Sequence, residues 1–317
     1  MTIDIPEIDI SPLFDKSDST GFETVAKKLE AAYTKVGFAY IFGYPIDESL
    51  LKTFFETSRE FFHLPEATKS NYPIAGSSGS GFAGISDAPF QASNLGRFEQ
   101  TNQYESFRFK CLTGNDLNDF LQDDFQKENL WPDLYRAHLD SIHALVKSIF
   151  HCFNHIVQAF AVAFGLERHA LDSLFEQTNI GMKAHYYPEH PDHLENDAYT
   201  LFPHTDFVFV TLLATDGNPG LEVQDDAGKW HQVPFKPNRL ILNTGEVIER
   251  LTNDHFIATR HRVVTPPNVE RLSMPVFLNP EADQIIEPLK HFIKPGEKSH
   301  YPPTRFGDII KSYMRKK

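Results

Sequence analysis

Turn-forming residues divide the second half of the chain into short apolar segments. From about residue 180 onward these segments are rich in valine, isoleucine, leucine and phenylalanine, and they occupy residues 207–213, 221–224, 240–242, 262–264 and 272–278. The sequences Asp-Ala-Gly-Lys and Thr-Pro-Pro-Asn, which separate some of them, have the composition of turns. Short strands interrupted in this way predict a β-sandwich or a β-barrel.

The first half of the chain has the periodicity of amphipathic helices instead. Apolar residues recur at helical spacing through residues 20–36, 50–62 and 133–164, and shorter helices are expected at 168–177 and 306–314. A short apolar strand at 38–41 follows the first helix. The Gly/Ser-rich segment within 72–104 predicts a long loop, which is either a lid or a surface excursion. Because the strands need cover, we predict a mixed α/β fold with a mainly β core and buttressing helices.

The composition argues against several classes of protein. The chain has 317 residues, of which 41% are hydrophobic and 28 are phenylalanine, so we expect a packed core. Its 43 acidic residues outnumber 30 basic ones and give a net charge of −13, which disfavours nucleic acids and anionic membranes as partners. No secretory signal and no run of about 20 apolar residues is visible. Two cysteines cannot form a disulfide framework, so we expect a cytoplasmic protein.

Histidines two positions before an acidic residue suggest a metal site. The chain has 15 histidines, and four pairs have this spacing: His138/Asp140, His190/Asp192, His193/Glu195 and His204/Asp206. The first pair lies on the expected long helix, where side chains two residues apart diverge and stay in solvent. The next two lie in a polar segment without a predicted strand. The last pair opens the predicted strand 207–213, and in extended backbone its two side chains share one face.

A metal site needs a third ligand, and His261 is the best candidate. It stands at the head of the predicted strand 262–264. Two histidines and one carboxylate make the facial triad of non-haem Fe(II) oxygenases, which leaves coordination positions for a substrate and O₂. The alternative for His261 taken alone is an ordinary core or surface histidine.

Two further segments place polar groups near this triad. The Pro-Pro turn makes residues 261–264 and 269–277 a predicted antiparallel pair, which would bring Arg271 and Ser273 to the inward face beside His261. A buried arginine needs an anionic partner and suits a carboxylate, whereas the alternative is an exposed surface salt bridge. If residues 182–187 form a strand, His185 and Tyr187 share a face, and the tyrosine hydroxyl could complete a carboxylate pocket. The alternative there is an edge-strand aromatic pair.

Several motifs in a fixed order carry a resemblance to a known family. They are Gly37-Phe38-Ala39-Tyr40-Ile41, Glu105-Ser106-Phe107, Lys183 to Pro188, His204-Thr205-Asp206, Gly220-Leu221-Glu222-Val223, Asn243-Thr244-Gly245-Glu246, His261-Arg262-Val263, Arg271-Leu272-Ser273 and Phe277-Leu278-Asn279-Pro280. Each motif is weak alone, but together they cover nearly the whole chain. The sequence resembles the 2-oxoglutarate/Fe(II)-dependent dioxygenases of the isopenicillin N synthase-like family.

The resemblance implies a fold, a cofactor and a reaction. The fold would be a distorted double-stranded β-helix, or jelly roll, with Fe(II) held by His204, Asp206 and His261. 2-Oxoglutarate would bind the iron, and its far carboxylate would pair with Arg271 and Ser273, assisted by Tyr187. With O₂, such enzymes convert 2-oxoglutarate to succinate and CO₂ while they hydroxylate, desaturate or cyclise a small organic substrate.

The resemblance also implies a division of the chain. Residues 1–317 would form a single catalytic unit, with a mainly helical portion at 1–178, the dioxygenase core at 179–290 and a C-terminal helical segment at 291–317. A monomer is compatible with this reading, and the pocket should be locally cationic despite the acidic surface.

The chain departs from the family pattern at two positions. His185 stands where asparagine is usual, which changes how this strand meets the co-substrate or substrate. Glu246 stands where aspartate is usual, and we interpret it as structural. Two rival functions remain: an Fe(II) oxidase of the same fold that needs no 2-oxoglutarate, and a non-catalytic jelly-roll binding module. The C-terminal glutamine ligand of isopenicillin N synthase has no counterpart, because the last glutamine is Gln284.

The prime substrate is not specified by these motifs. Pocket walls in this fold come from loops and N-terminal segments, so the candidate substrate-binding residues are His185, Phe82, Asn102, Phe107, Arg108 and Phe207. Arg108 would suit an acidic substrate, although an exposed salt bridge is the alternative.

Overall fold

Two β-sheets form the centre of the molecule. The computed structural model describes residues 3–74, 80–85, 91–92, 96–97, 102–112, 130–176, 179–190 and 200–314. The larger sheet has eight strands in the order β1 (Glu7–Asp9), β2 (Phe38–Phe42), β12 (Leu240–Thr244), β9 (Val210–Thr215), β14 (Arg271–Asn279), β7 (Asn179–Tyr187), β6 (Glu105–Leu112) and β3 (Gly81–Ala83). The smaller has four, in the order β11 (Trp230–Gln232), β10 (Leu221–Gln224), β13 (His261–Val263) and β8 (Leu201–His204).

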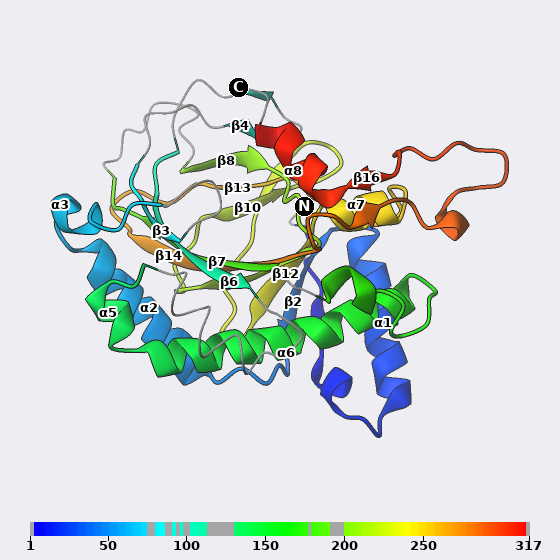
Figure 1. Cartoon of the computed structure of the whole chain (residues 1–317), viewed down its shortest axis with the longest axis horizontal. Helices are drawn as coiled ribbons and strands as arrows, with labels where there is room; N and C mark the ends of the chain where they lie inside the picture. The colour runs from blue at the N-terminus through cyan, green and yellow to red at the C-terminus, as the bar shows by residue number, and fades with distance from the viewer. Residues whose placement is uncertain are drawn as a thin grey trace.

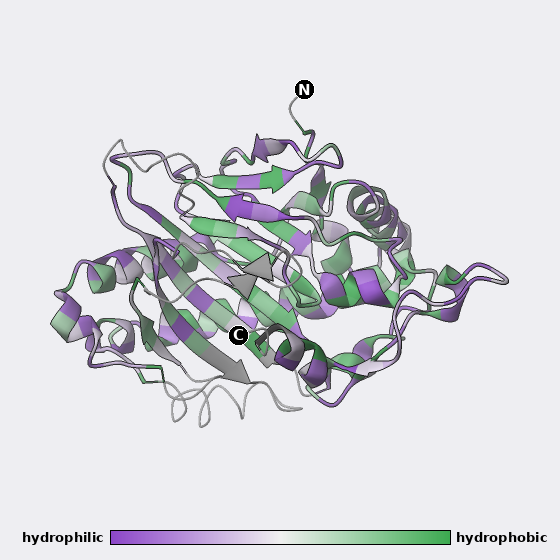
Figure 2. Cartoon of the chain, turned by 90° about the horizontal axis from the view of Figure 1, so that it is seen from above, coloured by the Kyte–Doolittle hydropathy of each residue, from purple (hydrophilic) through white to green (hydrophobic). Residues whose placement is uncertain are grey.

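The two sheets lie one above the other, and helices cover the outer face of the larger one (Figure 1). All neighbouring strands within them run antiparallel except β1 and β2, which are parallel. The strands are short and alternate in direction, as a jelly roll requires. Figure 2 shows that the central strands are largely apolar, whereas polar residues dominate the surrounding loops.

Three long helices supply the cover. α1 (Ser19–Tyr33) and α2 (Glu48–Phe62) each pack on α6 (Leu139–Ala163), and α2 also contacts β7 and β14. The carboxylate of Asp18 caps α1 by accepting a hydrogen bond of 2.7 Å from the Gly21 N–H. The shorter helical elements are η1 (Ser11–Phe14), α3 (Glu66–Lys69), α5 (Asp133–Arg136), η2 (Asp172–Phe175), α7 (Glu246–Leu251), η3 (Lys290–Phe292) and α8 (Phe306–Met314). Three-residue or shorter strands complete the pattern at β4 (Gln91–Ala92), β5 (Gly96–Arg97), β15 (Ile285–Ile286) and β16 (Thr304–Arg305).

α6 is long and strongly apolar, although the sequence contains no uninterrupted run of about 20 apolar residues. Among the described residues it is the one helix long and apolar enough to cross a membrane, judged by length and composition. However, 56% of its most apolar 18-residue window is buried inside the protein. Its apolar side chains belong to the main hydrophobic cluster, together with residues of α1, α2 and the larger sheet. α6 therefore packs as the core helix of this fold, and Figure 1 shows it running along the sheet.

Most of the predicted elements are confirmed, with two corrections. The predicted strand 207–213 is wrong at its start, because β9 begins at Val210 and residues 205–209 form a loop. In this loop the carbonyls of Asp206 and Phe209 accept hydrogen bonds from Glu246 and Gly245, so they cannot join a sheet. The predicted helix at 168–177 is reduced to the single 3₁₀ turn η2.

The predicted antiparallel pair of 261–264 with 269–277 is also wrong. β13 pairs with β8 and β10 in the smaller sheet, whereas β14 pairs with β7 and β9 in the larger one. The turn at 265–268, in which Asn268 has a φ of 57°, therefore carries the chain from one sheet to the other. As a result His261 and Arg271 face each other across the space between the sheets.

Some predictions fall on residues that the structure does not describe. Much of the expected loop at 72–104 lies outside the described residues, as do Asp192 and the His193/Glu195 pair. His138 and Asp140 are described, and both are exposed at the start of α6, as expected for a solvated pair.

Candidate active site

Three side chains with metal-binding atoms converge between the sheets. His204 ends β8, His261 begins β13, and the two are direct partners in the antiparallel ladder. His204 Nε2 lies 3.8 Å from Asp206 Oδ1, and His261 Nε2 lies 3.8 Å from Asp206 Oδ2. One donor atom from each residue lies within 4.8 Å of the other two. Within the described part of the chain, no other group of three such residues is placed to hold a metal ion.

Hydrogen bonds to the backbone orient both imidazole rings. His204 Nδ1 lies 2.8 Å from the Phe202 carbonyl oxygen, and His261 Nδ1 lies 3.1 Å from that of Thr259. A carbonyl oxygen can only accept, so each Nδ1 carries the proton. When the ring is neutral, its Nε2 consequently turns an unprotonated lone pair toward Asp206, which is the tautomer that a metal ligand needs.

The carboxylate of Asp206 is also held in place. Its Oδ2 accepts hydrogen bonds of 2.6 Å from the Thr211 hydroxyl and 2.8 Å from the Asn243 amide. Thr211 comes from β9 and Asn243 from β12, and these residues are partners in the ladder. The larger sheet therefore fixes the orientation of this carboxylate and leaves its Oδ1 free of hydrogen bonds from the described residues.

The protonation states at the triad suit a cation. Burial, together with the charge of His261, lowers the pKa of His204 to about 4, so this imidazole is neutral near pH 7. Burial raises the pKa of Asp206, but the two histidines and the bonds from Thr211 and Asn243 outweigh it and lower that pKa overall. A neutral imidazole and an ionised carboxylate are the ligand forms that bind a divalent metal.

The start of α7 holds the loop that carries Asp206. The Glu246 N–H donates to the Asp206 carbonyl at 2.8 Å, and the Thr205 hydroxyl donates to Glu246 Oε1 at 2.6 Å. Gly245 is required here, because a Cβ atom at this position would lie 2.0 Å from the Val208 carbonyl oxygen. Glu246 is buried and bonds to the loop, in line with the structural role that its motif suggested.

α7 also carries a buried carboxyl group that should make stability depend on pH. Burial raises the pKa of Glu249 to about 7 from 4.5, and its Oε1 accepts a bond from the Ala258 N–H. Because the folded pKa is the higher one, the folded state binds more protons between these values, and stability falls as pH rises through this window. Glu249→Gln keeps the acceptor without the charge. We expect it to raise the free energy of unfolding by about 1–3 kcal/mol at pH 8 and by much less near pH 4.5.

Urea denaturation at the two pH values measures this difference. Glu23→Gln, on the exposed side of α1, controls for removal of a negative charge from this acidic protein. An equal gain for Glu249→Gln at both pH values would contradict the assignment.

A second group of polar side chains lies opposite the triad, on β14 and β7. Arg271 pairs in register with Tyr187, and Ser273 pairs with His185. Arg271 is 1% exposed, and its guanidinium lies 5.0 Å from the centre of the Tyr187 ring. Burial raises the pKa of Tyr187, although Arg271 and Ser273 act in the other direction, so the hydroxyl stays protonated. The four side chains line the same cavity as His204, Asp206 and His261.

Three buried nitrogen atoms of this group lack a hydrogen-bond partner. They are Nε and Nη1 of Arg271 and Nε2 of His185. Burial, with the charges of Lys183 and Arg271, lowers the pKa of His185 well below 6.5, so the ring is neutral. Its Nδ1 lies 3.4 Å from the Tyr187 hydroxyl. A buried donor without an acceptor costs about 1–3 kcal/mol, and more when it is charged. The cavity is therefore built to receive an acceptor-rich, negatively charged group.

An ion-pair network outside the sheets fixes the start of β14. Arg59 of α2 donates to Glu270 Oε1 at 2.7 Å and to Asp216 Oδ2 at 3.1 Å. The same Asp216 oxygen accepts from the Leu272 N–H at 2.9 Å. These bonds hold the residues on both sides of Arg271, so the neighbouring carboxylates are engaged outside while the guanidinium points inward.

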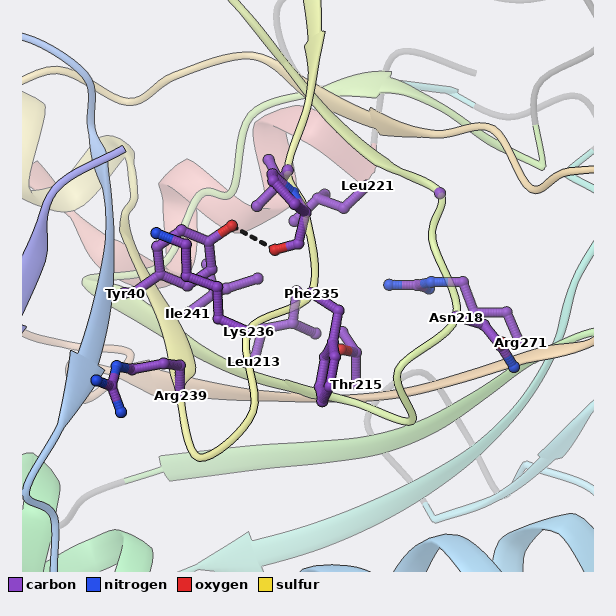
Figure 3. Close-up of a pocket in the computed structure, with 13 residues that line it drawn as sticks. Tyr40, Leu213, Thr215, Asn218, Leu221, Phe235, Lys236, Arg239, Ile241 and Arg271 are labelled. Carbon is purple, nitrogen blue, oxygen red and sulfur yellow. Dashed lines mark hydrogen bonds between the residues drawn. The ribbon is translucent and has the colours of Figure 1, made fainter. Parts of the chain in front are cut away.

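A second, smaller cavity lies on the other side of Arg271. Figure 3 shows Arg271 and Asn218 at one side of it, and Tyr40, Lys236 and Arg239 at the other. The Tyr40 hydroxyl donates to the Pro234 carbonyl across this cavity. Lys236 and Arg239 are both paired with Glu7, at 2.7 Å and 2.9 Å. Arg271 is thus the cation of this region that still lacks an acidic partner among the described residues.

The remaining candidate residues are divided between the cavity and the core. Phe82 and Phe107 are buried against Phe61 of α2, on the helix-covered side of the sheet, and the structure does not bring them to the cavity. Asn102 accepts a bond of 3.2 Å from the Phe202 N–H, close to β8. Phe207 directly follows Asp206 in the loop and is half-buried.

Arg108 lies on the cavity side of β6. It pairs in register with Lys183 of β7, just as Ser106 pairs with His185. Side chains alternate between the faces of a strand, so Arg108 and Phe107 must point to opposite sides. Lys183, Thr211 and Asn243 were given no role from the sequence, although Lys183 and Asn243 stand in two of the quoted motifs. Lys183 could have been found, since it precedes His185 by two residues in a predicted strand.

The comparisons with known proteins bear on this geometry. Residues 179–280 match the family model of the 2OG-Fe(II) oxygenase superfamily, and residues 5–134 match the N-terminal region of a non-haem dioxygenase in morphine synthesis. The chain belongs to the 2OG-Fe(II) oxygenase superfamily. The first match includes His204, Asp206, His261 and Arg271, so the family assignment covers the cavity described above.

Curated relatives span nearly all of this oxygenase. A 2-oxoglutarate-Fe(II) type oxidoreductase of Aspergillus fumigatus is 27% identical, over 98% of this chain and 92% of its own. Jasmonate-induced oxygenase 2 of Arabidopsis thaliana is 26% identical, over 98% and 79%. Among solved structures, a full-length Neurospora crassa protein in complex with alpha-KG and thymine has a TM-score of 0.82 at 22% identity, covering 98% and 96% of the two chains. A putative 2OG-Fe(II) oxygenase family protein from Caulobacter crescentus has a TM-score of 0.81 at 24% identity, covering all of both.

These matches confirm the fold and the class of chemistry that the motifs indicated. The protein is an oxidoreductase with a jelly-roll core, and it uses Fe(II), 2-oxoglutarate and O₂. Solved structures of the same fold bind small molecules, thymine in one and JA in another. Of the functions considered from the sequence, the 2-oxoglutarate-dependent oxygenase is therefore the one supported.

Proposed function

We propose that this oxygenase hydroxylates a small organic substrate between its two sheets. In this proposal His204, Asp206 and His261 hold Fe(II), and residues 1–317 act as a single catalytic unit. The supporting observation is the convergence of the Nε2 atoms of His204 and His261 on one carboxylate, with each imidazole ring and the carboxylate fixed by a hydrogen bond from behind. Fe(II) and 2-oxoglutarate supply the redox chemistry, in which O₂ is divided between the hydroxylated product and succinate, with loss of CO₂.

We further propose that Arg271, Ser273 and Tyr187 hold the far carboxylate of 2-oxoglutarate. The two unpartnered nitrogens of Arg271 form a fork that matches a carboxylate, and the neighbouring hydroxyls of Ser273 and Tyr187 add donors. His185 is neutral, and its Nε2 faces the same cavity, so this ring stands beside the co-substrate in place of the usual asparagine. The residues present therefore fit the co-substrate on charge and on hydrogen-bonding capacity.

The apolar side chains of the cavity keep water away from the reacting centre. Phe38, Leu213, Leu221 and Val263 line it together with the triad and Arg271. A dry cavity strengthens the attraction between the carboxylate and the guanidinium, and it protects a reactive oxidant from water. Asp206 is the one acidic side chain among its described lining residues, so the site carries few negative charges of its own.

Oxygen consumption and succinate release test this proposal. With Fe(II) and 2-oxoglutarate the protein should consume O₂ and form succinate, slowly without a prime substrate and faster when one is present. Without 2-oxoglutarate both should stop. Full O₂ consumption in the absence of 2-oxoglutarate would show an oxidase instead. For any compound that accelerates succinate release, product mass distinguishes the gain of one oxygen atom from the loss of two hydrogens in desaturation or ring closure.

The remaining expectations from the sequence also stand as proposals. A cytoplasmic, monomeric protein that does not bind nucleic acid fits the net charge of −13 and the buried free thiol of Cys152. Fluorescence microscopy of a tagged chain and sedimentation analysis measure location and oligomeric state.

A further inference from the structure

Two cations face each other beside the metal triad. Lys183 on β7 and Arg108 on β6 are direct partners in the antiparallel ladder, with their side chains on the cavity face of the sheet. The Lys183 ammonium lies 4.9 Å from the centre of the Phe277 ring, and Phe277 lines the cavity that contains the triad. Both charges act on His185, the next inward-facing residue of β7.

Neither cation has an acidic partner among the described residues. No carboxylate there forms an ion pair or a hydrogen bond with Lys183 or Arg108, and Arg108 Nε is buried without an acceptor. The carboxylate whose charge acts on Lys183 is that of Asp206, which belongs to the triad. Burial, followed by the charge of Arg108, lowers the pKa of Lys183 to about 8. Like charges directly opposite each other destabilise a sheet, so this arrangement has an energetic cost.

Three other partly buried cations of the chain are paired with carboxylates. Lys69 bonds to Glu105 at 2.6 Å, Arg262 bonds to Glu222 at 2.7 Å, and Arg59 bonds to Glu270 at 2.7 Å. Lys69 is a close comparison, because it is a buried lysine that also lies near a phenylalanine ring, that of Phe82. The difference between Lys69 and Lys183 is the partner, because no carboxylate of the described residues pairs with Lys183.

Lys183 and Arg108 lie at a different part of the larger sheet from Arg271, which we propose holds the far carboxylate of 2-oxoglutarate. Arg271 is the ladder partner of Tyr187, which lies four residues beyond Lys183 on β7. Four residues of extended strand span about 13 Å. Lys183 and Arg271 therefore start from different parts of the sheet, and the 2-oxoglutarate affinities measured below distinguish a separate anion site from a shared one.

We infer that Lys183 and Arg108 form the anion-binding end of the prime-substrate site, and that the prime substrate is an organic carboxylate. The planar guanidinium of Arg108 matches a carboxylate, and the ammonium of Lys183 supplies a second charge at the same place. The substrate then spans from this pair toward the triad, past His185 and Phe277. This inference rests on the proposed function and names the substrate class of that same site.

Matched carboxylates and amides test the inference. Phenylacetate and indole-3-acetate are compared with phenylacetamide and indole-3-acetamide, using the protein loaded with Mn(II) and 2-oxoglutarate. We expect the carboxylates to bind at least tenfold more tightly than the amides, measured by thermal shift and calorimetry. With Fe(II), they should also accelerate succinate release more than the amides do. Carboxylates that bind no better than their amides would overturn the inference.

Two substitutions locate the effect. Lys183→Met and Arg108→Met should each weaken carboxylate binding tenfold or more, while the affinity for 2-oxoglutarate changes less than twofold. Lys28→Met, on the exposed side of α1, is the matched control and should leave carboxylate binding as it is. If Lys183→Met weakens 2-oxoglutarate instead, the pair belongs to the co-substrate and the inference is wrong.

A ligand-free measurement makes the test independent of the chosen compounds. Because the two positive charges repel each other, Lys183→Met should raise the Tm of the unliganded protein by a few degrees. The rise should be smaller when Lys183→Met is combined with Arg108→Met, because the repulsion is then already absent. A fall of several degrees would show that Lys183 has a structural partner. Failure of the wild type to bind 2-oxoglutarate would contradict the proposed function, whereas normal 2-oxoglutarate turnover without carboxylate preference contradicts this inference alone.

Discussion

Replacing Asp206 with alanine should abolish specific Fe(II) binding. This carboxylate is the one charged member of the triad, and each histidine Nε2 lies 3.8 Å from one of its oxygens. Loss of residues that merely orient metal ligands typically costs 10–100-fold in affinity, so removal of a ligand that also carries the charge should cost more, on the order of 10³-fold. Calorimetric titration of the metal-free protein with Mn(II) or Fe(II) under anaerobic conditions measures this loss.

The structure provides a matched control for this prediction. Asp225 also pairs with a histidine, His231, at 2.6 Å, but it lies in a surface turn without a third ligand. Asp225→Ala should leave iron affinity unchanged. Asn243→Ala, which removes a donor to Asp206 Oδ2, should weaken iron binding by about 10–100-fold. An Asp206→Ala protein that is folded and binds iron as tightly as the wild type would refute the proposed ligand set.

The sequence predicted the triad for a reason that is only partly correct. His204 and Asp206 were expected to share the face of a strand, but Asp206 lies in a loop whose carbonyls dock on the start of α7. This docking depends on a close approach at Gly245, about 40 residues away in the sequence, and local strand propensity carries no information about it. The spacing of histidine and aspartate was sufficient to select the three side chains that converge. The loop that positions Asp206 was not predictable from the residues next to it in the sequence.

The path of the chain after His261 is a second feature that local sequence does not predict. A Pro-Pro turn flanked by two apolar segments has the same composition whether it closes a hairpin or crosses between sheets. Here it crosses, and the choice is set by the pairing of β14 with β7 and β9. The inward-facing residues of β14 were nevertheless identified correctly, because the alternation of side chains along a strand does not depend on its neighbour. Lys183 could have been found by the same rule.

Arg271→Met should weaken 2-oxoglutarate binding by about 10²- to 10³-fold without affecting iron. The guanidinium is 1% exposed, and two of its nitrogens lack a partner. Removing one partner of a buried ion pair costs about 3–5 kcal/mol, because the other charge is left buried and unpaired. The KM for 2-oxoglutarate should rise accordingly, while the affinity for Mn(II) stays at the wild-type value. Arg271→Lys should recover part of the loss, since an ammonium supplies the charge but not the two-pronged geometry.

The unliganded stability of the same variants separates a ligand-binding arginine from a structural one. Arg262 on β13 is paired with Glu222 at 2.7 Å, so Arg262→Met breaks an existing bond and should lower stability while it leaves 2-oxoglutarate affinity intact. Arg271→Met removes a buried charge that has no acidic partner among the described residues, so the unliganded protein should lose little stability or gain some. Added 2-oxoglutarate should then raise the Tm of the wild type and of Arg262→Met, but not that of Arg271→Met. If Arg271→Met unfolds more readily and still responds to 2-oxoglutarate, the guanidinium stabilises the barrel and does not bind the co-substrate.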